Sequence, residues 1–196
     1  MYAISLTIEF RYLFTDAYYY LSLGSSFNDD YIKDLISAER KYQWPNYLYA
    51  ILIILIPSVL VSFCLYVGII LKGLKTSFSK VLDISFKSQI IFALNYFICT
   101  LLKVFNLIQK DYQNINNNYD FQSLLVFLKN KQLPDWLVYP LEKINTSELI
   151  FVLFLSFGFS FITKQSYKTS IIFVFICYGI GLFIWVIFTL FLRTLI

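Results

Sequence analysis

The feature that most constrains the fold is a long apolar run, from about Tyr47 to Leu71, that contains no charged side chain. A helix needs about 20 predominantly apolar residues to cross the hydrocarbon core of a bilayer. Three further runs reach or approach this length, over residues 86–108, 146–163 and 170–192. Backbone polar groups find no water inside a bilayer, so these runs are expected to be helices rather than strands. The sequence therefore predicts an all-α integral membrane protein, a four-helix transmembrane bundle with amphipathic interfacial helices.

The composition supports this class and excludes others. Hydrophobic residues make up 59% of the 196 residues and charged residues 14%, whereas soluble domains carry about 45–50% and about 25%. The net charge of +4 is spread along the chain, without the basic block that follows nucleic-acid phosphates. We therefore expect membrane lipids around this chain and no nucleic-acid partner.

The residues that enzymes use are missing or scattered. The chain contains no histidine, so no imidazole serves as a base or as a metal ligand. Cys64, Cys99 and Cys177 lie far apart in apolar runs and form no Cys-x-x-Cys pair. No phosphate-binding glycine loop and no zinc motif occurs. We predict that the protein is not an enzyme, has no catalytic, cofactor-binding or metal site, and turns its cysteines toward lipid or a neighbouring helix.

The chain divides into two predicted parts. Residues 1–46 form an N-terminal interfacial, amphipathic segment, and residues 47–196 form the transmembrane domain, with a loop over 109–145 between its second and third spans. Residues 4–12 alternate between apolar and polar, which is typical of a strand. A lone strand would have no partner in a helical chain, so we favour an interfacial helix and leave both alternatives open.

Two further segments have the composition of amphipathic helices. Residues 28–42 begin with Asn28, a good helix cap, followed by two aspartates that complement the positive end of a helix. Residues 76–87 connect the first two spans and are basic. This composition predicts a helix that lies against anionic headgroups.

The second span contains most of the polar residues of the apolar runs. The candidate intramembrane polar contacts are Gln89, Asn95, Asn106 and Lys103. Such side chains usually form hydrogen bonds between helices, and we favour this interpretation over a polar path for a substrate. Small residues provide a second kind of contact, because they let two helices approach closely. Gly158 and Ser160 in the third span and Gly179 and Gly181 in the fourth are candidates.

Residues at the ends of the spans give further predictions. The candidate interface anchors are aromatic: Trp44, Trp136, Tyr139 and Trp185. Asn145 and Glu148 have the spacing of a capping box at the start of the third span. Pro57 lies inside the first span, where it removes one helical hydrogen bond and predicts a packing kink.

Lysines are concentrated in the two short connectors between spans, where they predict the orientation. They are Lys72, Lys75, Lys80, Lys87, Lys164 and Lys168. Basic residues in short loops stay in the cytoplasm, which places both connectors there and both chain ends on the other side. Arg40 and Lys41, close to the first span, favour the opposite orientation.

Four stretches carry a resemblance to a known group of proteins. They are Gln43–Tyr47, Ser77–Val81, Leu133–Leu141 and Tyr178–Trp185. Over about residues 40–192, their order resembles small Yip1-like multi-pass bacterial membrane proteins. The resemblance implies membrane organisation or recruitment of partners, without catalysis, in the bacterial inner (cytoplasmic) membrane. It carries no functional residue over to this chain.

Two functions follow as hypotheses. The first is a non-enzymatic accessory or scaffold subunit of a larger membrane complex, whose partners would be other membrane-protein subunits. The second is a small transporter or channel subunit with a polar path through the second span. Gln89 and Asn95 fall on different faces of an ideal helix, which disfavours a continuous polar lining.

Overall fold

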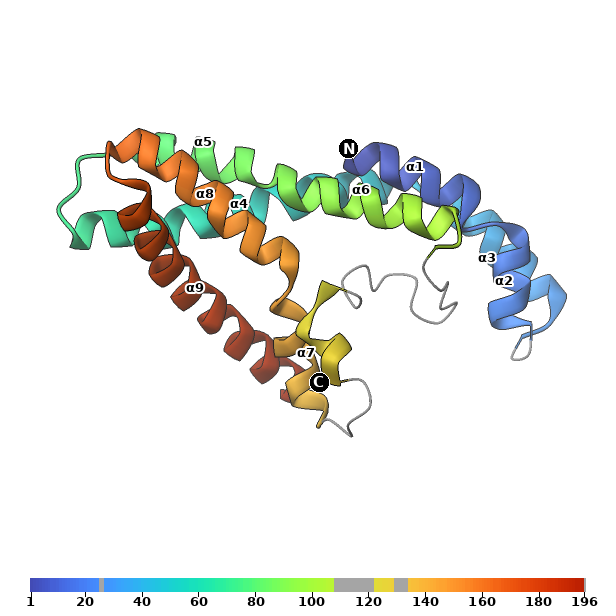
Figure 1. Cartoon of the computed structure of the whole chain (residues 1–196). Coiled ribbons are helices and arrows are strands. Elements are labelled where there is room, and N and C mark those ends of the chain that lie inside the picture. Colours follow the sequence, from blue (N-terminus) through green and yellow to red (C-terminus); the bar gives the residue numbers. More distant parts are fainter. Residues whose placement is uncertain (25–26, 108–121, 129–133, 196) are drawn as a thin grey trace. The chain divides into compact units, whose positions relative to one another are not determined.

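The computed structural model describes residues 1–24, 27–107, 122–128 and 134–195 (Figure 1). Helices make up 85% of the structure, and its described residues contain no strand. This result confirms the predicted all-α class. One isolated antiparallel bridge joins Ser123 to Asn145.

Four helical stretches in the described chain are long and apolar enough to cross a membrane. They are Trp44–Leu71, Phe78–Val104, Thr146–Thr163 and Tyr167–Leu192. The first belongs to helix α4 (Trp44–Leu71), the third to α8 (Thr146–Thr163) and the fourth to α9 (Tyr167–Leu195). Four such helices indicate an integral membrane protein.

The second stretch differs most from its predicted range of 86–108. It joins α5 (Phe78–Ser88) to α6 (Ile90–Val104), so most of the predicted connector over 76–87 forms α5, an amphipathic helix as predicted, whereas its position against headgroups stays a prediction. The two faces of α5 have different surroundings. Its inner face buries Val81 and Ile84 and packs against α8. On its outer face Lys87 pairs with an aspartate one turn earlier, which reduces the basic character.

Three short helices precede the first span: α1 (Tyr2–Tyr12), α2 (Asp16–Leu23) and α3 (Asp29–Lys41). Residues 4–12 are therefore helical, as we favoured, and the strand alternative is wrong. The amphipathic helix predicted over 28–42 is confirmed as α3, and the Asn28 side chain accepts a hydrogen bond from the Tyr31 N–H at 3.0 Å. Helices α2 and α3 pack together through a small apolar cluster around Ile32.

The chain separates into two compact units. Unit 1 comprises residues 1–53 and 93–118, and unit 2 comprises residues 54–92 and 119–196. The boundary between the two units divides α4 after Ile53. In an uninterrupted helix, the carbonyl of Ile53 would accept a hydrogen bond from the N–H of residue 57. Pro57 has no N–H to give. The helix continues through this proline, and the kink stays a prediction.

The core of unit 2 is centred on α8. Phe151, Leu155 and Phe159 recur every four residues along this helix, and each is fully buried. Side chains of α4, α5 and α9 surround them in one apolar cluster. Because lipid is as apolar as these side chains, close packing rather than exclusion of water holds such a core together in a bilayer.

The region predicted as the loop over 109–145 is described in part. Residues 108–121 and 129–133 lie outside the described residues, including Phe121 and Leu133. The remainder contains a short 3₁₀ helix, Leu124–Leu128, and helix α7 (Asp135–Lys143), which contacts it. Asn145 ends this region and caps α8, accepting a hydrogen bond from the Glu148 N–H at 2.9 Å, as predicted.

Candidate functional site

Helix α1 buries two polar residues and exposes several apolar ones. Ser5 and Glu9, four residues apart, are the buried residues of this helix. Ile4, by contrast, is 57% exposed. A helix at the surface of a soluble domain has the reverse arrangement. This pattern fits a helix whose outer face meets lipid and whose inner face meets polar groups of the same chain.

The centre of the buried polar face is the carboxylate of Glu9, which is 6% exposed. The Tyr96 hydroxyl of α6 donates a hydrogen bond to one of its oxygens, and the Thr100 hydroxyl donates to the other at 2.8 Å. The rings of Tyr2 and Tyr96 stack, with centroids 5.3 Å apart. Hydrogen bonds to a charged acceptor contribute about 1.5–3 kcal/mol each, so this carboxylate holds α1 to α6.

The face of α6 that contacts Glu9 includes two of the candidate polar residues. Lys103 lies one turn beyond Thr100 and is 5% exposed. Asn95 is also buried, and its side-chain oxygen accepts a contact from the Cys99 thiol at 3.8 Å. Glu9 and Lys103 both interact electrostatically with the Cys99 thiol. The structure thus brings together Asn95, Lys103 and an acidic residue that the sequence analysis did not select.

The other two candidate polar residues lie elsewhere. Gln89 is buried at the junction of α5 and α6, in unit 2. Asn106 is exposed beyond the end of α6, with φ +55°. The Asn106 N–H bonds to the Lys103 carbonyl and the Leu107 N–H to the Leu102 carbonyl. These two bonds form a Schellman motif, so Asn106 ends the helix.

A second carboxylate with a hydrogen-bond partner on another helix belongs to unit 2, and it is half-buried. Glu148 stands in the first turn of α8, where its backbone N–H is capped by Asn145. Its carboxylate accepts a hydrogen bond from the Tyr178 hydroxyl of α9. The residue that the sequence predicted as part of a capping box therefore also links two spans. No sequence signal beyond the presence of a tyrosine in the next span pointed to this partner.

Helices α4 and α9 meet through two matched pairs of small residues. A Cβ atom added to Gly68 would lie 2.4 Å from the Cys177 sulfur, and one added to Gly181 would lie 2.6 Å from the Cys64 sulfur. Each helix thus contributes the pattern Cys-x-x-x-Gly, with the cysteine of one facing the glycine of the other. Patterns of small residues four apart favour close approach of membrane helices. Cys64 and Cys177 therefore face a neighbouring helix, one of the two predicted surroundings.

Two other glycines selected from the sequence behave differently: a Cβ atom added to Gly179 would have no neighbour within 4 Å, and Gly158 has a different partner. A Cβ atom added to Gly158 would lie 3.3 Å from the side chain of Ile84, so Gly158 faces α5 rather than the fourth span. Among the aromatic anchors, the Trp185 indole N–H donates to the Tyr139 hydroxyl at 3.2 Å and joins α9 to α7. Trp44 and Trp136 are both largely exposed, a position compatible with a membrane–water interface.

Metal ligands do not gather anywhere in the described part of the chain. No group of three or more Cys, Asp or Glu side chains there could hold an ion, and the three cysteines are free thiols. Comparisons with models of protein families, with curated proteins and with solved structures give no significant match. The resemblance to Yip1-like proteins therefore stays a prediction.

Proposed function

We propose that the protein is a non-enzymatic subunit of a larger membrane complex, and that its fourth span docks on a partner membrane protein. The observation that supports this proposal is the exposure of that span. In the most apolar 18-residue stretch of this span, 11% is buried within the protein's own fold. The corresponding share is 28–33% in the other three spans. Helix α9 therefore has the largest surface left for lipid or for another helix.

One face of α9 has the residue spacing of a helix–helix contact. Ile180, Phe183, Ile184 and Ile187 recur at positions i, i+3, i+4 and i+7, and each is at least half exposed. These large side chains form a continuous apolar stripe without a charge. Helices in a bilayer associate through van der Waals packing, and such a stripe offers a ridge for a second helix to pack against.

The polar residues of the second span support a structural role as well. Thr100 is fully buried and bonded to Glu9. Lys103 follows on the same buried face of α6, and Asn106 caps this helix. The Thr100 side chain thus joins two segments of the chain, as expected for an interhelical hydrogen bond.

The test is photo-crosslinking in native membranes, with a benzophenone amino acid at position 183 of the full chain. We expect crosslinking from this position to one membrane protein that also co-purifies in stoichiometric amount in mild detergent. Position 63 is the matched control, because Phe63 on α4 is 63% exposed and Phe183 is 65% exposed. A chain that purifies alone and crosslinks only to lipid from position 183 would refute the proposal.

A transport subunit is the second candidate, and one observation favours it. The side-chain nitrogen of Asn95 is buried and has no hydrogen-bond partner among the described residues. Buried donors are rarely left unpaired in native proteins, so a polar solute is a candidate partner for this nitrogen. Flux assays in liposomes with Asn95→Leu separate the two functions. A transporter loses flux, whereas a scaffold keeps its crosslinked partner. Asn106 is unsuited to this test because its replacement disturbs a helix end.

A further inference from the structure

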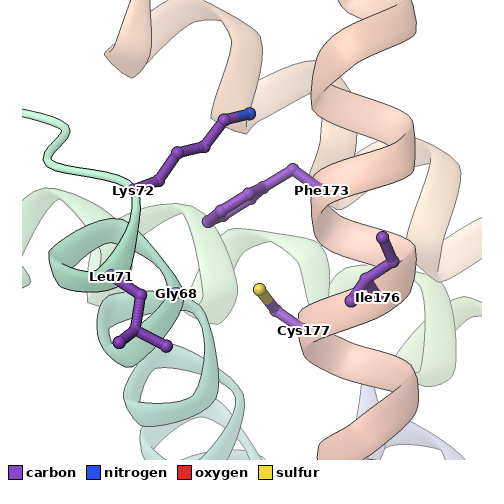
Figure 2. Close-up of a pocket in the computed structure, with 6 residues that line it drawn as sticks. All are labelled: Gly68, Leu71, Lys72, Phe173, Ile176 and Cys177. Carbon is purple, nitrogen blue, oxygen red and sulfur yellow. The ribbon is translucent and has the colours of Figure 1, made fainter.

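A cavity of about 280 Å³ lies between α4 and α9 in unit 2 (Figure 2). Its lining is apolar except for one charged residue, Lys72. The lining residues are Gly68, Leu71, Lys72, Phe173, Ile176 and Cys177. This volume is close to the lower end of the range for ligand sites, about 300–1,000 Å³. The cavity is therefore large enough for a slender apolar group, such as part of an acyl chain.

The end of α4 explains the position of the cavity. The two helices are in close contact at Gly68, where an added Cβ atom would clash with both Cys177 and the Phe173 ring. Helix α4 ends one turn further on, at Leu71, and Gly73 follows with φ +67°, a conformation that glycine adopts readily. The cavity thus lies at the end of a span, at the depth where acyl chains meet headgroups.

The charge at this end of unit 2 is basic and uncompensated. The Lys72 ammonium lies 5.2 Å from the centroid of the Phe173 ring, over the apolar wall of the cavity. None of the ion pairs among the described residues includes Lys72. The connector over residues 72–77 and the one over 164–168 contain four lysines and no acidic residue. A cation beside an apolar groove is complementary to a molecule with an anionic head and an apolar tail.

We propose that this cavity binds an anionic phospholipid, with one acyl chain against Phe173 and Ile176 and the phosphate at the Lys72 ammonium. Lysine at the end of a span reaches the headgroup level with its amine while its stem stays in the apolar layer. A basic residue near the surface strengthens binding of anionic lipid through electrostatic attraction. The site shares no residue with the stripe from Ile180 to Ile187, although Ile176 lies one turn before Ile180 on the same face of α9.

The first test is native mass spectrometry of the full chain from mixed micelles that contain phosphatidylglycerol or phosphatidylcholine. We expect the wild-type chain to retain phosphatidylglycerol about fivefold more strongly, which corresponds to about 1 kcal/mol. Lys72→Gln should remove this preference. Lys75→Gln is the matched control, since Lys75 is exposed in the same connector and does not line the cavity. Equal losses in both variants would overturn the proposal, because they would indicate general surface charge.

A second variant tests the apolar part of the site. Ile176→Trp should fill the cavity and weaken retention of both lipids at least fivefold. Ile172→Trp is its control, because Ile172 is exposed on the same helix and does not line the cavity. Two outcomes would overturn the proposal. One is an equal effect of both variants, and the other is a wild-type dimer that Ile176→Trp dissociates, which would assign the cavity to a second copy of the chain.

Discussion

Replacement of Glu9 by alanine is expected to release α1 from α6. The substitution removes the acceptor of two hydrogen bonds, from Tyr96 and from Thr100. At the lower value of about 1.5 kcal/mol for a bond to a charged group, the pair contributes about 3 kcal/mol. The Thr100 hydroxyl is fully buried, so the variant also leaves a donor without its partner. Glu9→Gln keeps one acceptor oxygen and should cost about 1.5 kcal/mol, the contribution of one such bond.

The assay is hydrogen–deuterium exchange of the α1 amides in detergent or nanodiscs. A loss of about 3 kcal/mol should accelerate exchange of residues 2–12 by more than a hundredfold in Glu9→Ala, and the smaller loss by about tenfold in Glu9→Gln. Exchange in α2 and α3 should stay unchanged, because those two helices pack through their own apolar cluster.

Arg11→Gln is the control, since Arg11 is an exposed charge on the same helix. In this variant, the backbone amides of α1 should exchange hydrogen at nearly the wild-type rate. The reasoning is refuted if Glu9→Ala exchanges within about threefold of the wild type, or if Arg11→Gln accelerates exchange as much as Glu9→Ala does.

Two further substitutions test contacts within unit 2. Gly181→Leu places a side chain where the Cys64 sulfur lies, so it should separate α4 from α9 and lower the melting temperature in detergent. Gly179→Ala has open space around the added atom and should leave the melting temperature unchanged; equal shifts would contradict the close approach. Tyr178→Phe removes the donor to the half-buried Glu148 carboxylate. It should cost about 1.5–3 kcal/mol in detergent unfolding, and an unfolding free energy equal to that of the wild type would show that this hydrogen bond contributes nothing.

Local signals in the sequence were sufficient for much of the fold. The long apolar runs predicted four candidate spans, because crossing a bilayer sets a minimum length of apolar helix. Asn28 and Asn145 predicted the starts of two helices, because a cap bonds to a backbone N–H only three residues away. The amphipathic helix predicted over residues 76–87 is present as α5, but only the tertiary structure shows that its apolar face packs against α8.

The candidate site was only partly predictable. Asn95 and Lys103 stood out as polar residues in an apolar run, and both lie on the buried polar face of α6. Glu9 was not selected from the sequence, because the alternation of residues 4–12 is typical of a strand, in which Ser5 and Glu9 suggest no buried site. In the helical alternative, Ser5 and Glu9 are four residues apart and share a face, which is the signal that could have selected them.

The sequence by itself determined the class of this protein: a charge-poor helical chain with four segments able to span a membrane and no histidine for catalysis or metal binding. Only the tertiary structure decided which side chains meet. Tyr96 lies 87 residues from Glu9, and Cys64 faces a glycine in the last span. The physical reason is that hydropathy depends on composition, and apolar spans resemble one another in composition. A hydrogen bond or a close helix contact depends instead on the position of individual atoms from distant segments.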